Sequence, residues 1–85
     1  MFYVYVLRSE VTGRRYTGSC ENLENRLRRH NAGYSKATKA GVPWKLVHHE
    51  AFETRSEALE RERFFKTGQG REELDGYESG NKSET

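Results

Sequence analysis

Residues 2–8, FYVYVLR, are the feature that most constrains how this chain folds. β-Branched and aromatic residues alternate along them, which predicts a β-strand. Successive side chains of a strand point to opposite faces, so Val4 and Val6 are expected on one face and Tyr5 on the other. A chain of 85 residues can form only a small core of marginal stability, so most of the fold has to contribute to its packing.

The following residues return the chain alongside that strand. SEVTG (9–13) is a turn pattern, and residues 14–19 predict a second strand. The result is a β-hairpin that carries Tyr5 and Tyr16. The two tyrosines are either packing material or side chains that face a substrate.

A helix and a third strand come next. The helix is predicted over residues 23–30, with Asn22 as its N-cap and Gly33 as its C-terminal stop. A basic loop over 33–43 follows it. Residues 44–52, WKLVHHEAF, then predict a strand.

The second helix has the clearest start in the sequence. Thr54 and Glu57 fit a capping box, in which each side chain binds the backbone N–H of the other residue. The helix is expected to run to about Lys66, where TGQG (67–70) breaks it, and residues 71–74 add a short helical turn.

The order β-β-α-β-α-(α) predicts an α/β fold of the α+β type, a small sandwich with an antiparallel sheet. No repeat or second hydrophobic pattern divides the chain. A single domain is therefore expected over residues 1–75, followed by an acidic, flexible tail over residues 76–85.

Charge is distributed unevenly along the chain. The net charge is +2, but residues 1–71 hold fourteen Lys and Arg against eight Glu, and residues 72–85 hold one Lys against five acidic residues. A basic body suggests a polyanionic partner, in particular nucleic acid; a solvated surface of mixed charge is the alternative. The single cysteine, Cys20, excludes an intrachain disulfide and favours a reducing cytoplasm, and no apolar run or leader pattern indicates a membrane or an export route.

Glu62 lies in the apolar stripe of the second predicted helix, four residues after Ala58 and three before Phe65. A half-buried carboxylate needs a partner, which is either a cation or a metal ion. A glutamate at the rim, paired with a nearby arginine, is the alternative.

Arg26 and His30 are four residues apart, so they share one face of the first predicted helix. The planar fork of an arginine suits a phosphate, and a histidine can carry a proton near neutral pH. A solvated basic helix end, as expected for Arg28 and Arg29, is the alternative.

Together these side chains form a set that can hydrolyse a phosphodiester: Tyr5, Tyr16, Arg26, His30 and Glu62. A divalent ion on Glu62 would stabilise the leaving oxygen and the charge on the phosphate. A tyrosine would take a proton from the attacking water, and Arg26 would hold the scissile phosphate.

The same residues resemble the GIY-YIG nuclease domain over roughly residues 2–71. Tyr3-Val4-Tyr5 stands where the family has Gly-Ile-Tyr, and Tyr16-Thr17-Gly18 stands where it has Tyr-Ile-Gly. Arg26 follows at the spacing of the family's catalytic arginine, and His30 where many members carry a histidine.

The segment EALERERFFKTGQGR (57–71) is similar to the family's metal-binding helix, with Glu62 as the metal-binding glutamate. The resemblance implies DNA cleavage that depends on one Mg²⁺ or Mn²⁺ ion, and a three-stranded antiparallel sheet flanked by helices. It also implies that Tyr5 and Tyr16 line the site, with Tyr16 as the first candidate for the general base. The short length is similar to that of standalone bacterial members.

The sequence departs from the family's pattern at three points. Tyr3 replaces the glycine of the first motif and Thr17 the isoleucine of the second, which affects packing more than chemistry. Many members also carry an asparagine a few turns beyond the metal-binding glutamate. The only later asparagine here is Asn81, in the expected tail, so that role is vacant.

These observations predict a DNA endonuclease that acts in DNA repair or processing, on substrates that include branched, nicked or single-stranded DNA. A non-catalytic module that binds nucleic acid through the same basic face is the alternative, and a protein-interaction domain with an acidic recruiting tail is a third. The oligomeric state is left open. The residues expected to contact the nucleic-acid backbone are basic: Arg14, Arg15, Lys36, Lys39, Lys66 and Arg71.

Overall fold

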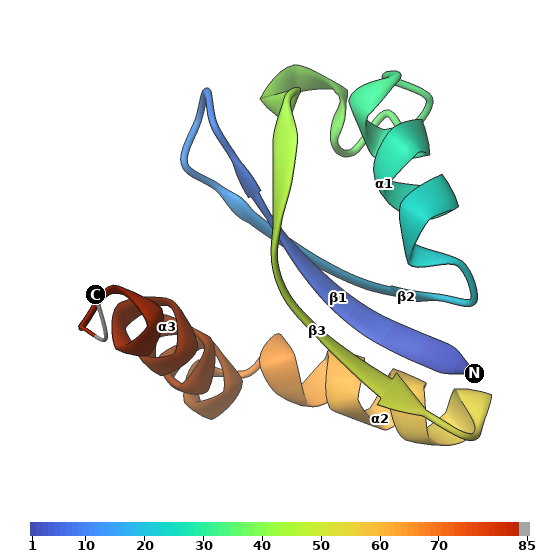
Figure 1. Cartoon of the computed structure of the whole chain (residues 1–85), viewed down its shortest axis with the longest axis vertical. Helices are drawn as coiled ribbons and strands as arrows, with labels where there is room; N and C mark the ends of the chain where they lie inside the picture. The colour runs from blue at the N-terminus through green and yellow to red at the C-terminus, as the bar shows by residue number, and fades with distance from the viewer. Residues whose placement is uncertain (84–85) are drawn as a thin grey trace.

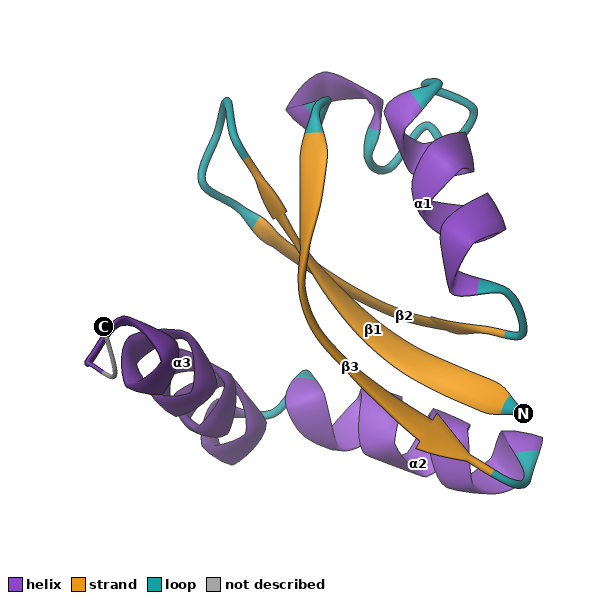
Figure 2. Cartoon of the chain, in the orientation of Figure 1, coloured by secondary structure: helices purple, strands orange, loops and turns teal. Residues whose placement is uncertain are grey.

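The structure is a computed structural model that describes residues 1–83, with side chains described up to residue 78. Three strands cross the middle of the molecule, and helices lie on both sides of them (Figure 1, Figure 2). The predicted order β-β-α-β-α-α is confirmed, with a short 3-10 turn added before the third strand. The elements are β1 (Phe2–Ser9), β2 (Arg15–Cys20), α1 (Leu23–Asn31), η1 (Lys39–Gly41), β3 (Trp44–Phe52), α2 (Arg55–Phe65) and α3 (Gly68–Ser83).

The strands form one antiparallel sheet in the order β2-β1-β3, as predicted. The hairpin register pairs Tyr5 with Gly18 and Leu7 with Tyr16. Paired residues of neighbouring strands share a face, so the Tyr5 and Tyr16 rings lie on the same side of the sheet. β2 is an edge strand, and its outer side carries no further strand within the described residues.

The two faces of β1 pack against different helices. One face meets α2 and α3 in an apolar cluster of Val4, Val6, Ala58, Phe65 and Leu74. The other face lies under α1 and carries the buried cluster of Tyr5, Leu7 and Trp44. Full burial of a large apolar side chain stabilises a fold by about 1.5–3 kcal/mol, so both faces contribute to stability.

Local signals place the helix starts where they were predicted. Asn22 caps α1 by accepting a hydrogen bond from the backbone N–H of Asn25 (2.9 Å). Thr54 and Glu57 form the capping box of α2. Gly33 follows α1 with φ +80°, a left-handed conformation that suits glycine, so the predicted helix stop is also observed.

α3 corrects the prediction of a short helical turn followed by a tail from Gly76, because the helix continues to Ser83. It starts close against α2: a β-carbon at Gly70 would overlap the carbonyl oxygen of Phe64. Neither α3 nor any other helix in the described part of the chain is long and apolar enough to cross a membrane.

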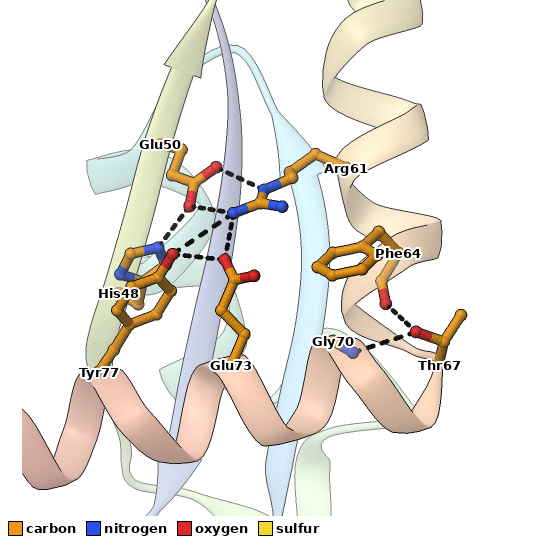
Figure 3. A network of polar contacts seen from close by, with 8 residues as sticks. All are labelled: His48, Glu50, Arg61, Phe64, Thr67, Gly70, Glu73 and Tyr77. Atoms are coloured by element: carbon orange, nitrogen blue, oxygen red, sulfur yellow. Dashed lines mark hydrogen bonds and ion pairs between the residues drawn. The ribbon is translucent and has the colours of Figure 1, made fainter.

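Polar and stacking contacts around Arg61 hold α3 against the sheet and against α2 (Figure 3). We call this set the Arg61 network; its members are His48, Glu50, Arg61, Glu73 and Tyr77. Arg61 of α2 donates to Oε1 of Glu50 on β3 (2.9 Å) and pairs with Glu73 of α3. The hydroxyl of Tyr77 donates to Glu73, and its ring stacks on His48 with centroids 4.3 Å apart. These contacts reach beyond Gly76 and explain why the helix does not stop near Leu74.

Candidate active site

The β-hairpin brings two phenol rings together, with the centroids of Tyr5 and Tyr16 6.3 Å apart. Gly18 makes room for them. A β-carbon at this position would lie 2.7 Å from Oη of Tyr5 and 3.2 Å from Cε2 of Tyr16. The glycine of the second motif is therefore required by the packing of the two tyrosines.

Tyr5 belongs to a buried chain of hydrogen bonds. Its hydroxyl lies 2.9 Å from Nε2 of His30, and Nδ1 of His30 lies 2.8 Å from Oγ1 of Thr38. The three residues are 2%, 4% and 1% exposed, respectively. The indole N–H of Trp44 donates to the carbonyl oxygen of Thr38 (2.7 Å) and anchors the far end. These hydrogen bonds therefore fix the orientation of both the Tyr5 phenol and the His30 imidazole.

Burial keeps this hydrogen-bonded chain uncharged at pH 7. It raises the pKa of Tyr5 above the ordinary value of 10.0, and the neighbouring Tyr16 adds to that effect. It lowers the pKa of His30 below 6.5, and the positive charges of Arg26 and Arg29 lower it further. A neutral imidazole has one donor and one acceptor nitrogen, and both nitrogens of His30 are engaged. The imidazole thus orients Tyr5, and His30 is only 4% exposed.

Tyr16 and Arg26 face an open cleft of about 200 Å³ on the α1 side of the sheet, the central cleft. Tyr16 is half-buried, and its ring centroid lies 5.0 Å from that of His30. A water molecule or a phosphate in the cleft can reach Tyr16, whereas the buried Tyr5 is shielded. The residues that line the central cleft are Tyr16, Arg26, Arg29, His30, Tyr34 and Ser35.

Glu62 lies around the edge of β2, on α2. Its side chain is 19% exposed, and its carboxylate is 2.8 Å from Nζ of Lys66. Ala58, Glu62 and Lys66 follow one another at four-residue spacing, so they form one line along the helix. Ala58 lines a cleft together with Arg26, and Lys66 lines another together with Tyr16. Glu62 therefore lies between these two clefts, beside β2.

The three clefts form a band around the open edge of β2. The central cleft shares Arg26 with a cleft of about 250 Å³ that also contains Arg55 and Ala58, the Arg55 cleft. It shares Tyr16 with a second cleft of about 250 Å³, the Lys66 cleft. Side chains of β2 and α2 contribute to both outer clefts, so the band reaches from the α1 side of the sheet to the α2 side.

The six basic residues predicted to contact nucleic acid divide into two groups. One group lines the Lys66 cleft: Arg15, Lys66 and Arg71. The other group is exposed but lines none of the three clefts: Arg14, Lys36 and Lys39. Only the first group lies on the band that carries Tyr16 and Arg26.

Two residues of the Lys66 cleft already hold partners within the chain. Arg15 pairs with Asp75 (2.8 Å) and with Glu78 (3.0 Å). Lys66 pairs with Glu62, so the partner of that carboxylate is a lysine and not the arginine considered as an alternative. A nucleic-acid phosphate would have to replace a carboxylate at either position.

Sequence reasoning missed four residues of the site. Arg29 and Tyr34 line the central cleft, and Arg55, 3.6 Å from Glu21, lines the Arg55 cleft. Thr38 holds His30 from the loop after α1. Only Arg29 had a usable signal, because its distance of three residues from Arg26 places both on one side of a helix.

Glu62 is the carboxylate that the sequence predicts as the metal ligand. Within the described residues, no three His, Cys, Asp or Glu side chains gather as metal ligands. Mg²⁺ does not require such a group, because one or two carboxylates commonly hold it while waters and substrate phosphates complete its shell. A half-buried carboxylate oxygen between two basic clefts fits this ion once Lys66 leaves it.

The sequence of this chain is similar to those of known proteins. Residues 1–75 match the family model of the GIY-YIG catalytic domain. A UPF0213 protein of Staphylococcus saprophyticus is 42% identical over 66 residues, which cover 76% of this chain and 79% of that protein. A UPF0213 protein of Haloquadratum walsbyi is 44% identical over 66 residues, which cover 76% and 73%, respectively.

A solved structure shares the fold. The solution NMR structure of a UPF0213 protein from Bacillus halodurans is similar with a TM-score of 0.55 and 31% sequence identity, covering 96% of both chains. The names of these three relatives state no activity, so the substrate has to be inferred from the site itself.

Proposed function

Because this chain belongs to the GIY-YIG catalytic domain family, we propose that it is a metal-dependent endonuclease that hydrolyses phosphodiester bonds in DNA. The observation that carries the proposal is the meeting of Tyr16 and Arg26 on one open cleft, with the Glu62 carboxylate around the edge of the same strand. A base, a cation for the phosphate and a metal-binding carboxylate are the groups that this reaction needs. In this proposal residues 1–75 form the nuclease domain, and DNA repair or processing is its setting.

Arg26 and Tyr16 perform the chemistry at the phosphate. Arg26 binds the scissile phosphate through its guanidinium N–H groups and stabilises the charge that develops there. Tyr16, as a phenolate, takes a proton from the water that attacks phosphorus. As the bond to the water oxygen forms, the bond to the leaving oxygen breaks, and that oxygen takes up a proton from solvent.

Tyr5 and His30 position the base. Their hydrogen-bonded chain lies beneath the Tyr16 ring, whose centroid is 6.3 Å from the Tyr5 ring and 5.0 Å from the imidazole. Both residues are buried, so in this proposal they act mainly through Tyr16, although His30 also lines the central cleft.

Glu62 is the residue to which we assign the metal ion. When bound, Mg²⁺ or Mn²⁺ supplies positive charge to the phosphate and to the leaving oxygen. Lys66, which pairs with Glu62 at 2.8 Å, has to give up that carboxylate. Lys66 also lines the Lys66 cleft, where a DNA phosphate offers it a replacement partner.

A non-catalytic nucleic-acid-binding module is the second candidate. The Glu62–Lys66 ion pair favours it, because a carboxylate that is satisfied within the chain needs no metal. Such a module would use the same band of basic clefts and would bind DNA equally well with metal or with chelator.

The deciding experiment is a cleavage assay on labelled single-stranded, duplex, nicked and branched DNA, in Mg²⁺, Mn²⁺ or chelator. Glu62→Gln removes the metal-binding charge with little change in size. Glu60→Gln, at an exposed position of the same helix, is the matched control.

Metal-dependent cleavage that is lost in Glu62→Gln and kept in Glu60→Gln would support the proposal. Cleavage by Glu62→Gln at the wild-type rate would contradict the metal assignment. Salt-sensitive binding with no cleavage of any substrate would favour the binding module.

A further inference from the structure

An exposed aromatic side chain lies on the wall of the central cleft. Tyr34 is 76% exposed, and it lines the cleft together with Arg26 and Arg29. The end of α1 sets its place: Gly33 adopts φ +80°, and the backbone N–H of Tyr34 donates to the carbonyl oxygen of Arg29 (3.3 Å). This turn carries the ring to the cleft and away from the core.

The Tyr34 ring is packed differently from three other tyrosines. Tyr5, Tyr16 and Tyr77 each contact another aromatic ring, whereas Tyr34 takes part in none of the aromatic contacts in the described part of the chain. Val11, another exposed apolar side chain, does not line the cleft. Packing therefore does not account for a bare ring beside two arginines.

Building on the proposed function, we propose that Tyr34 stacks on an unpaired nucleobase of the DNA strand whose phosphate binds Arg26. Every base has a flat face that stacks on an aromatic ring whatever its sequence, while cations beside the ring hold the backbone. Arg26 and Arg29 supply these cations on the same cleft.

This contact selects a class of substrate. The bases of an intact duplex are paired and stacked on one another, and freeing one costs a few kcal/mol. A nucleotide in a single strand or in a single-stranded branch is already free to meet the ring. The preferred substrate therefore carries an unpaired nucleotide next to the scissile phosphate.

The test is a binding titration in chelator, so that cleavage plays no part. The probes are a single-stranded oligonucleotide that contains the fluorescent base 2-aminopurine, and the same oligonucleotide annealed to its complement. Tyr34→Ala is expected to weaken binding of the single strand by about 5- to 150-fold, the contribution of stacking one base. Its affinity for the duplex is expected to stay unchanged.

Two further variants control the experiment. Tyr34→Phe keeps the ring, so it is expected to bind the single strand as tightly as the wild type and to quench the fluorescent base in the same way. Val11→Ala removes an exposed apolar side chain away from the cleft and is expected to match the wild type on both probes. Circular dichroism confirms that each variant is folded.

The outcomes separate this inference from the proposed function. The stacking proposal is overturned if Tyr34→Ala binds the single strand as tightly as the wild type, if it loses affinity equally for both probes, or if the wild type binds neither probe. The cleavage assay with Glu62→Gln does not depend on the Tyr34 ring. Cleavage that Glu62→Gln abolishes would therefore leave the proposed function in place even where stacking fails.

Discussion

Two clusters of this molecule are built from the same kinds of side chain: arginine, histidine, tyrosine and glutamate. In the Arg61 network, between α2, α3 and β3, Arg61 is bound by Glu50 (2.9 Å) and by Glu73 (Figure 3). In the candidate active site, Arg26 takes part in none of the ion pairs found among the described residues. The arginine of one cluster is satisfied within the chain, and that of the other faces open clefts.

The difference teaches that pairing, more than residue type, separates a structural cluster from a candidate site. Burial would raise the pKa of Glu50, but hydrogen bonds from Arg61 and His48 hold it below the ordinary 4.5. The hydrogen bond to Glu50 in turn raises the pKa of Arg61, and Glu73 adds to it. These charges stabilise one another and hold α3 in place. Arg26 keeps its charge available for a phosphate.

The largest contrast is expected between Arg26→Ala and Arg61→Ala. Removing Arg26 takes away charge stabilisation at the phosphate, which is expected to slow cleavage by about 10²–10³-fold. The free energy of unfolding is expected to change by less than about 1 kcal/mol. Arg61→Ala leaves two carboxylates without their partner and is expected to lower that free energy by about 1–3 kcal/mol.

Cleavage rates and urea unfolding curves of the two variants check this contrast. If the two variants showed equal losses of cleavage rate and equal free energies of unfolding, the distinction between a paired cluster and an open cluster would be wrong.

Two glycines offer the next contrast. Gly18→Ala would place a β-carbon 2.7 Å from Oη of Tyr5. The displaced ring is expected to lower the free energy of unfolding by about 1–3 kcal/mol and to slow cleavage. Gly76, on α3, has open space at its β-carbon position, so Gly76→Ala is expected to stabilise the helix by about 0.5–1 kcal/mol. Thermal unfolding of both variants measures the effect, and an unchanged melting temperature for Gly18→Ala would show that the two tyrosines can repack.

Acid is expected to weaken the two clusters in different pH ranges. The pKa of His30 is lowered by folding, so the unfolded chain binds that proton first, and stability falls as the pH drops below about 6.5. The pKa of Glu50 is also lowered, so its contribution is lost as the pH drops below about 4.5. His30→Gln is expected to reduce the loss of stability that begins below about pH 6.5, the upper decline. Glu50→Gln is expected to reduce the loss that begins below about pH 4.5, the lower decline.

Urea unfolding at several pH values between about 7.5 and 2.5 measures both declines. His49→Gln, at an exposed position on β3, is the control for the loss of one histidine. An upper decline that persists unchanged in His30→Gln would contradict the assignment of that decline to the buried imidazole.

The smallest expected effect concerns one phosphate contact. Arg29→Ala removes a charge that lines the central cleft. A plot of the logarithm of the DNA-binding constant against the logarithm of the salt concentration is therefore expected to have a slope shallower by about 0.7–0.9. Arg63→Ala removes a charge from an exposed position of α2 that lines none of the three clefts, so its slope is expected to match the wild type. DNA titrations at several salt concentrations measure both slopes, and equal slopes would place the phosphate path elsewhere.

Signals that act within a few residues predicted most of the fold. Alternation in β1, the Asn22 cap and the capping box of α2 depend only on close neighbours in the chain, so they hold whatever surrounds them. The length of α3 could not be predicted in this way. Its contacts come from distant residues, such as Arg8 paired with Glu78, and Gly76 weakens the local helix signal.

In the candidate site, too, local sequence signals predicted some positions, and tertiary packing decided the others. The strand pattern placed Tyr5 and Tyr16 on one hairpin, and helical spacing placed His30 on the same helix face as Arg26. The structure brings the rings of Tyr5, Tyr16 and His30 together. The partner of His30 could not be predicted, because Thr38 comes from a loop whose path depends on tertiary packing. The position of Tyr34 could not be predicted either, because the left-handed conformation of Gly33 directs Tyr34 to the central cleft.

Arg15 lines the Lys66 cleft with Asp75 and Glu78 already bound to it. A DNA phosphate at this end of the band has to compete with two carboxylates for one guanidinium. These competitors are tethered to the chain, so their effective concentration is set by the geometry of α3 and does not fall on dilution. The phosphate exchanges one anion for another there, and the binding energy gained at Arg15 is only the difference between the two.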